Sequence, residues 1–330
     1  MSDKFNAIVA SEIDGKTKGQ LQQITLADLP EEDVLIEVSY SSLNFKDGLA
    51  VSGKGNICKR LPMVCGIDLS GRVLESSSDK FKAGDLVLVN GYGLGEKHWG
   101  GYSQKARINS DFIVHVPDTF SLQDVMAIGT AGYTAMLSVM MLERQGVKPT
   151  DGEVLVTGAA GGVGSVAIAL LSALGYQVVA STGRPETHTY LSELGATSFV
   201  NRSELSEKGA PLAAEKWAGV IDTVGSYTLA NAIAQTKRDG CVTACGLAGG
   251  IDLPATVFPF ILRGVVLAGI DSVMASMALR TEAWRRLAND LPKDKINAIS
   301  RVEPMSSLPE LAELIVGGKI RGRVVIDVNT

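Results

Sequence analysis

The sequence predicts a two-domain α/β protein, in which a barrel-like β domain precedes a doubly wound parallel sheet. Up to about Pro117 the chain consists of short β-rich runs separated by Gly, Pro, Asp and Asn. After Pro149, strands alternate with helices, as they do in βαβ units. A chain of 330 residues also exceeds the roughly 250 to 300 residues at which single cores stop growing, which favours two domains.

Six runs in the first part predict strands, and they read FNAIVA, DVLIEVSY, SGRVLE, DLVLVNG, YSQKARI and FIVHV. The next segment, SLQDVMAIGTAGYTAMLSVMMLERQG, has a helical period. Ser121 is its predicted N-cap and Gly146 its predicted stop. The barrel-like domain is therefore expected to end near residue 122.

The second part predicts the strands EVLVTG, QVVAST, SFVN, GVIDTV and CVTACG. Between them lie the predicted helices SVAIALLSALG, ETHTYLSELG, LAAEKW and TLANAIAQT. The tail predicts helices at EAWRRLANDL and LPELAELIVGG and a last strand, RVVIDV, with no later strand to pair with. We therefore predict a barrel-like domain over 1–122, an α/β domain over 123–266, and a segment over 267–330 that returns to the first domain.

Composition excludes several classes of protein. A net charge of −5 lacks the basic excess that nucleic-acid binding requires. The 4 cysteines are too few and too scattered to predict a disulfide framework. The charged N-terminus does not resemble a signal peptide, and no later run is apolar for about 18 residues. We expect a soluble cytoplasmic protein that acts on small molecules and contacts neither membrane nor nucleic acid.

A glycine-rich loop joins the first strand of the second part to its helix. It reads Gly158-Ala-Ala-Gly161-Gly162-Val163-Gly164, a form of the dinucleotide fingerprint. A pyrophosphate needs close approach to backbone amides at a helix N-terminus, which glycine permits. A tight turn without a ligand is the alternative, and the regular βαβ series around the loop favours the Rossmann interpretation.

The residues after the second strand favour NADPH over NADH. NAD-specific sites place an acidic residue there to bind the ribose 2′-hydroxyl. This chain has Ser181, Thr182, Gly183 and Arg184 instead, which suit a 2′-phosphate in charge and hydrogen bonding, and Arg202 could add a second positive contact. The alternative is that Arg184 only begins a solvated loop.

Two segments are candidates for the nicotinamide end of the cofactor. Leu247 follows the strand CVTACG, whose carboxyl end should face the ligand crevice. Thr130, in GTAGYTA, begins the linking helix. Each of these segments could equally be a glycine turn that serves packing.

A catalytic metal is not expected. The chain has 3 histidines and no C-x-x-C pair, and its early segments read SLNFKD and GID, which do not supply a Cys and His zinc set. Without a Lewis acid, hydride addition to an activated C=C bond is favoured over alcohol oxidation, because it needs only carbonyl polarisation and a proton.

Segments along nearly the whole chain resemble the quinone-oxidoreductase-like branch of the medium-chain dehydrogenase/reductase superfamily, and within it the bacterial acrylyl-CoA reductases. Examples are SSLNFKDGLAVSGKG, MVCGIDLSG, GTAGYTAM, VTGAAGGVGSVAIALL and FPFILRGVVLAGIDSVM. The resemblance implies a GroES-like catalytic domain, NADPH-dependent reduction of acryloyl-CoA to propionyl-CoA, and a homodimer. It also implies cofactor contacts at Phe45, Gly161 to Gly164, Thr182 to Arg184, Arg202, Leu247, Ile261, Ser272 and Arg323.

Within that mechanism, the electrophilic candidate is Asn44, whose amide could hydrogen-bond a carbonyl or the cofactor. A turn residue that caps the following FKDGLA segment is the alternative. Asp47 could orient its neighbours or cap the same helix, and His98 could donate a proton or simply be exposed. The cations Lys54, Lys59 and Arg60 could bind the phosphates of an acyl-CoA, or could be solvated loop charges.

Two other functions fit the same sequence. The first is an enzyme with the same cofactor that reduces a quinone or a small enone. The second is an NADPH-binding redox sensor without catalysis, because a fold does not fix a function.

Overall fold

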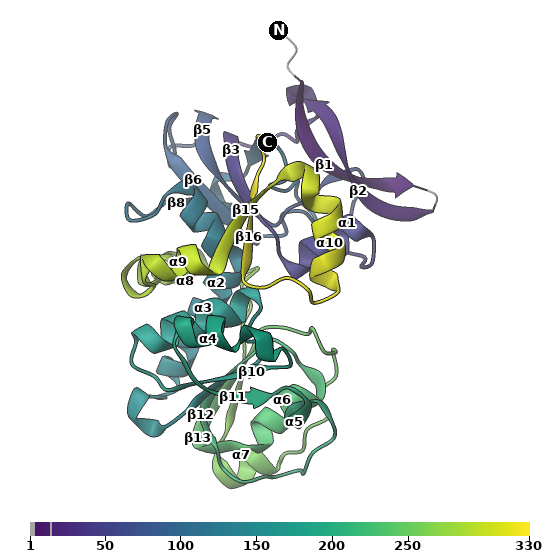
Figure 1. Ribbon diagram of the computed structural model, residues 1–330. Helices are drawn as coiled ribbons and strands as arrows, with labels where there is room; N and C mark the ends of the chain where they lie inside the picture. Colours follow the sequence, from purple (N-terminus) through teal and green to yellow (C-terminus); the bar gives the residue numbers. More distant parts are fainter. Residues whose placement is uncertain (1–3, 14) are drawn as a thin grey trace. The chain divides into compact units, whose positions relative to one another are not determined.

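The computed structural model describes residues 4–13 and 15–330 (Figure 1). The chain forms two compact units. The β unit comprises Met1–Thr130, Val273–Trp284 and Ser300–Thr330, and the α/β unit comprises Ala131–Ser272 and Arg285–Ile299. The tail of the chain is thus divided between the two units.

The β unit contains two sheets. In the smaller one the order is β2-β1-β4, and in the larger one it is β15-β16-β3-β5-β6-β8, with β7 also paired to β3. The strands are β1 (Lys4–Ile13), β2 (Lys16–Thr25), β3 (Val34–Ser42), β4 (Met63–Val64), β5 (Asp68–Ser76), β6 (Leu86–Asn90), β7 (Lys105–Ile108), β8 (Val114–His115), β15 (Ser300–Pro304) and β16 (Arg323–Asp327). The sequence patterns did not predict β2, β4 or β15. Because β16 pairs antiparallel with β3, the C-terminal strand lies in the same sheet as the early strands.

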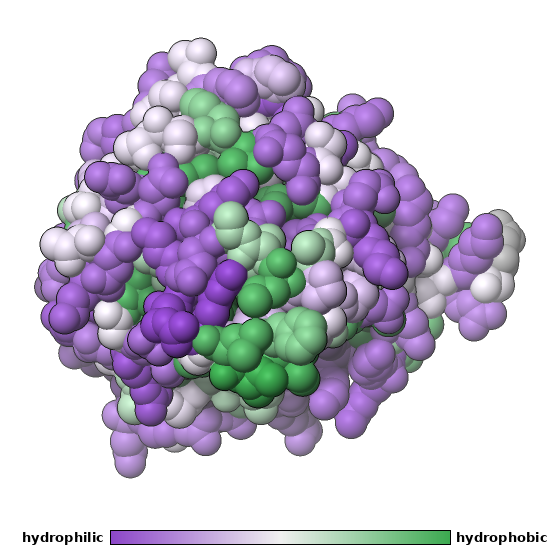
Figure 2. Space-filling view, turned by 90° about the horizontal axis from the view of Figure 1, so that it is seen from below, coloured by the Kyte–Doolittle hydropathy of each residue, from purple (hydrophilic) through white to green (hydrophobic). Residues whose placement is uncertain are grey.

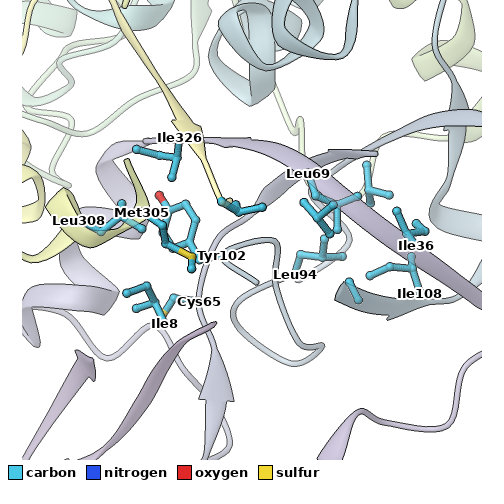
Figure 3. Packing of buried hydrophobic residues seen from close by; sticks show 14 of the residues in the cluster. Ile8, Ile36, Cys65, Leu69, Leu94, Tyr102, Ile108, Met305, Leu308 and Ile326 are labelled. Carbon is cyan, nitrogen blue, oxygen red and sulfur yellow. The ribbon is translucent and has the colours of Figure 1, made fainter. Parts of the chain in front are cut away.

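The core of the β unit joins residues from both ends of the chain. Figure 3 shows Ile8 and Tyr102 packed near Met305, Leu308 and Ile326. Two helices belong to this unit, α1 (Phe45–Ser52) and α10 (Leu308–Val316), and they pack against each other. Gly48 permits their close approach, since a Cβ there would overlap the side chain of Ile315.

The α/β unit contains a parallel sheet of six strands in the order β11-β10-β9-β12-β13-β14. The strands are β9 (Val154–Val156), β10 (Val178–Thr182), β11 (Ala196–Asn201), β12 (Trp217–Asp222), β13 (Thr236–Ala244) and β14 (Val266–Gly269). The central residues of β9, β10 and β12 are buried, as is usual for parallel sheets covered on both faces. The edge strand β14 was not predicted from the sequence.

Three of the four helices predicted between these strands are confirmed as α3 (Gly162–Ala173), α4 (His188–Leu194) and α6 (Ser226–Ala234). The short helices α5 (Ser203–Ser206) and α7 (Phe258–Arg263) were not predicted. After the last strand of this sheet come α8 (Met277–Asp290) and α9 (Lys293–Ile299). The predicted helix LAAEKW is wrong. Its backbone instead pairs with the end of α6, since the amides of Ala213 and Lys216 donate to the carbonyls of Ala234 and Gln235 at 3.0 and 2.8 Å.

The long helix α2 (Leu122–Arg144) begins and ends close to the predicted positions. Ser121 and Asp124 form a reciprocal cap of 2.9 and 3.1 Å, which confirms the N-cap. Gly129 breaks the helix with φ 53° and ψ −162°, a feature that the apolar run GTAG did not reveal. Length and composition would allow α2 to cross a membrane, but 83% of its most apolar window is buried, as in a core helix.

Candidate active site

The first part of the site lies where β3 gives way to α1. Asn44 is the N-cap of α1, and its backbone N–H donates to Asp47 Oδ2 at 2.9 Å. The other oxygen of Asp47 accepts the backbone N–H of Ile67 at 3.0 Å. Asp47 therefore links the start of α1 to the segment that leads into β5.

Asp68 is the centre of a buried polar cluster. Its Oδ1 accepts from Asn90 at 2.7 Å and from the hydroxyl of Thr130. Its Oδ2 accepts from Asn44 Nδ2 at 2.9 Å, from the backbone N–H of Thr130 at 2.9 Å and from the hydroxyl of Ser42. The break at Gly129 releases the N–H of Thr130 for this contact, because it begins a new helical segment.

Arg323 supplies the positive charge of this cluster. Its side chain is buried, and it donates to the carbonyls of Ala127 and Leu43 and to Asn44 Oδ1 at 3.0 to 3.1 Å. Nη2 has no hydrogen-bond partner within the described chain. A Cβ on residue 129 would overlap Nη2, so glycine is required there. Burial lowers the pKa of Arg323, while the charges of Asp68 and Asp47 oppose that shift.

Burial also changes the titration of Asp47. It raises the pKa of this carboxyl to about 7, and the negative charge of Asp68 adds to the increase. The hydrogen bonds from Asn44 and Ile67 act in the opposite direction. Asp47 therefore keeps its proton to a higher pH than an ordinary aspartate does.

The donor set of this cluster does not fit a zinc ion. Within residues 4–13 and 15–330, no three His, Cys, Asp or Glu side chains are grouped so that they could hold a metal. The oxygens of Asp68 already accept five hydrogen bonds, and Arg323 supplies the compensating charge. Metal analysis of the purified protein would test the prediction that no metal is bound.

The three catalytic candidates do not form one group. The amide of Asn44 is used within the cluster, since Nδ2 reaches three acceptors at 2.9 to 3.3 Å and Oδ1 accepts from Arg323. This geometry matches the helix-capping alternative for Asn44. His98 contacts Glu32 at 3.9 Å and packs edge-on against Phe112, away from these partners.

The α/β unit presents the glycine loop as the sequence predicts. Gly161 is the N-cap of α3, and Gly162 to Gly164 form its first turn. A Cβ at Gly164 would lie 2.5 Å from the carbonyl oxygen of Gly158, so only glycine permits this close packing. Within the described chain no side chain caps this helix end, and the first amides of α3 can bind a pyrophosphate.

Backbone hydrogen bonds bring two arginines to the end of β10. The backbone N–H of Arg202 donates to Thr182 O at 3.1 Å, and the N–H of Arg184 donates to Thr182 Oγ1 at 3.1 Å. The side chain of Arg202 lies over Gly183, because a Cβ there would overlap its Nε and Cδ atoms. Ser181 is buried beside Thr182. The structure thus brings Arg184 and Arg202 to the same turn, although they are far apart in the sequence.

The other predicted cofactor residues have side chains that are at least partly exposed. Leu247 and Ile261 are 56% and 69% exposed, large fractions for apolar side chains, and Ser272 is half-buried. Phe45, the first residue of α1, is 38% exposed, so its ring is open to contact. Leu247 lies next to Gly225, where a Cβ would be 3.5 Å from its Cα.

The three cations predicted to bind the phosphates of an acyl-CoA have different surroundings. Lys54 forms an ion pair with Glu313, and Lys59 Nζ donates to Asn56 O at 2.8 Å. Arg60 lines a pocket that also contains His98. Arg60 therefore shares a cavity with another predicted site residue.

Sequence reasoning missed the main organising residues of the β unit. From the sequence, Asp68 was considered only as part of a segment that could have held metal ligands, and no role was predicted for Ser42 or Gly129. The one available signal was an acidic residue in the otherwise apolar run MVCGIDL. A buried acid in such a run requires several donors, and these come from segments distant in sequence.

Comparisons with known proteins agree with this architecture. Residues 30–118 match the family model described as alcohol dehydrogenase GroES-like domain, and residues 162–289 match the one described as zinc-binding dehydrogenase. The chain is 52% identical to acrylyl-CoA reductase AcuI of Ruegeria pomeroyi, covering 98% of this chain and 99% of that protein.

Two solved structures are closely similar. Escherichia coli YhdH with bound NADPH is 50% identical with a TM-score of 0.96, covering 98% of this chain and 100% of the other. Bacillus subtilis yhfP with NAD bound is 41% identical with a TM-score of 0.95, covering 99% and 100%. The chain belongs to the medium-chain dehydrogenase/reductase superfamily and, within it, to the AcuI family.

Proposed function

We propose that this protein is an NADPH-dependent reductase of the C=C bond of acryloyl-CoA. One observation carries the cofactor assignment: Arg184 and Arg202 meet at the end of β10, beside the glycine-lined start of α3. The substrate assignment is supported by the 52% identical relative, which is named acrylyl-CoA reductase. A cytoplasmic location follows from this role, since acyl-CoA thioesters and NADPH are intracellular metabolites.

The overall reaction converts acryloyl-CoA, NADPH and a proton into propionyl-CoA and NADP⁺. When bound, NADPH supplies a hydride for the β-carbon, and the proton is added at the α-carbon. The amides of Gly162 to Gly164 are proposed to bind the pyrophosphate, and Arg184 and Arg202 the 2′-phosphate. The other proposed cofactor contacts are Phe45, Thr130, Ser181, Thr182, Gly183, Leu247, Ile261, Ser272 and Arg323.

In the β unit, Asn44 and Asp47 are proposed as positioning residues. Their hydrogen bonds fix the first turn of α1, which presents the exposed ring of Phe45. Arg323 Nη2 is the donor of the cluster that the described chain leaves unsatisfied, and it can bind an acceptor of the cofactor. The Asp68 cluster thus holds Arg323 and Asn44 in one arrangement and limits reorganisation during the reaction.

Isotope transfer tests this proposal. Purified protein is incubated with acryloyl-CoA and NADPH that carries deuterium at the transferable C4 position, and the product is analysed by mass spectrometry. Propionyl-CoA with one deuterium at C3 is expected. Tight NADPH binding without product would instead favour the redox-sensor alternative, and consumption of NADPH with quinones alone would favour the quinone-reductase alternative.

A homodimer through the α/β unit is also proposed. β14 is an edge strand of the six-stranded sheet, with unpaired backbone groups along one side. Figure 2 shows apolar surface gathered on the face that carries α7. The preceding segment and α7 expose Val257, Phe258 and Leu262 by 46 to 62%. A patch of this kind marks an interface.

Sedimentation velocity tests the homodimer. The wild-type protein should sediment as a dimer, and Leu262→Asp should sediment as a monomer, because it places a charge in the proposed interface. A wild-type monomer at micromolar concentration would contradict the proposal.

A further inference from the structure

The β unit contains a pocket of about 450 Å³ that none of the assignments above explains. Its volume lies within the range of small-molecule sites, roughly 300 to 1,000 Å³. Met63, Leu94 and Ile108 line it from the main core of the unit, and Figure 3 shows Leu94 and Ile108 within that core. Trp99 and Phe112 add aromatic rings. This part of the lining is apolar and aromatic, which suits a flat base.

Three cations surround that apolar lining. Arg60 and Lys97 are exposed, and Arg107 is half-buried on β7. Within the described chain none of the three forms an ion pair, whereas Lys46 and Lys54 nearby are paired with Glu96 and Glu313. Glu32 is the one carboxylate that lines the pocket. Unpaired cations around an apolar cavity indicate an anionic ligand with an apolar part.

The pocket is held in shape by its own backbone contacts. Lys59 N donates to Glu96 O at 2.8 Å, which ties the segment before Arg60 to the loop that carries Lys97. Gly95 N donates to His98 O at 2.8 Å within that loop. Phe112 is stacked on Tyr92 with ring centroids 4.6 Å apart, which fixes the aromatic side. A preformed pocket of this kind loses little entropy on binding.

The pocket also lies close along the chain to the polar cluster. Met63 lines the pocket, and five residues later Asp68 accepts the hydrogen bonds of Ser42 and Asn44. Even fully extended, those five residues span at most about 18 Å. The Cα atoms of Met63, in the pocket, and Asp68, in the cluster, are therefore no more than about 18 Å apart.

We propose that this pocket binds the phosphorylated adenosine end of the CoA thioester substrate. Arg60, Lys97 and Arg107 bind its phosphates, and the aromatic lining packs against the adenine base. This inference rests on the proposed function and deepens it. It also replaces the patch predicted from sequence, because Lys54 and Lys59 are engaged elsewhere and only Arg60 remains.

A binding experiment tests the pocket without turnover. Adenosine 3′,5′-bisphosphate is titrated by calorimetry into protein saturated with NADPH, so that the dinucleotide site is already filled. Arg60→Ala and Arg107→Ala should each weaken binding about tenfold or more, the effect of losing a charge-assisted hydrogen bond. Lys82→Ala, which removes an exposed cation outside the pocket, is the matched control and should bind like wild type. Equal affinities for all four proteins would overturn the proposal.

Kinetics separate this inference from the proposed function. The same variants are assayed with acryloyl-CoA and with the N-acetylcysteamine thioester of acrylate, which lacks the nucleotide. KM for acryloyl-CoA should rise about tenfold in the arginine variants, while kcat/KM for the short thioester stays unchanged. If wild type reduces acryloyl-CoA and the variants keep its KM, the pocket assignment is wrong. If wild type reduces neither thioester, the proposed function fails, and the bisphosphate titration still decides the pocket.

Discussion

Removing the Arg202 side chain should weaken NADPH binding and leave NADH binding unchanged. The side chain lies over Gly183 at the end of β10, next to Arg184, and it is exposed, so its guanidinium can reach a 2′-phosphate. A hydrogen bond to a charged group contributes about 1.5 to 3 kcal/mol. At 1.4 kcal/mol for each factor of ten, Arg202→Ala should raise the Kd for NADPH about ten- to a hundredfold.

Fluorescence titration of NADPH and NADH measures both dissociation constants directly. Arg238→Ala is a matched control, because Arg238 is an exposed arginine of the same unit at the start of β13, away from the end of β10. The control should bind both cofactors like wild type. An equal loss of affinity for NADPH and NADH in Arg202→Ala would refute the phosphate assignment and would indicate a general distortion of the turn.

Three further predictions concern stability. Gly164→Ala should lower the free energy of unfolding by ~1–3 kcal/mol, because its Cβ would overpack against fixed backbone. It should lower the thermal midpoint more than Gly161→Ala does, since a Cβ at residue 161 would lie 3.2 Å from its nearest atom. Equal midpoints would argue against tight packing at Gly164. Because the folded-state pKa of Asp47 is raised from 3.8 to about 7, this carboxyl makes wild type less stable as pH rises from about 4 to 7. Asp47→Asn lacks that contribution, so urea midpoints should fall less with pH than in wild type, and parallel curves would contradict the assignment. Arg323→Met should destabilise the protein by ~3–5 kcal/mol, because it leaves Asp47 and Asp68 buried without a cation. The loss of stability should be larger at pH 8 than at pH 6. A loss that does not depend on pH would show that packing dominates.

Much of the α/β unit could be predicted because its sequence periodicity reflects local structure. Strands buried on both faces and helices with apolar stripes alternate along the chain, and the glycines before α3 have a strict steric role. The failures arose where tertiary contacts override local preference. The segment LAAEKW has residues that favour a helix, yet it pairs with the end of α6.

The polar cluster of the β unit was less accessible to sequence reasoning. Asp68 gathers donors from the ends of β3, β6 and the first part of α2, and no spacing along the chain reveals this convergence. Asn44 was singled out from the sequence as an electrophilic or capping residue, but its capping and bridging bonds appear only in the structure. The pocket around Arg107 was missed for the same reason, since its cations come from three separate segments.

Parallel initial-rate measurements with acryloyl-CoA, using NADPH and NADH with a simple quinone as a third reaction, test the central claim most directly. Rapid NADPH consumption with the thioester and little with NADH is the expected result. Equal rates with NADH would contradict the role assigned to Arg184 and Arg202, and turnover of the quinone alone would contradict the assignment of acryloyl-CoA as substrate.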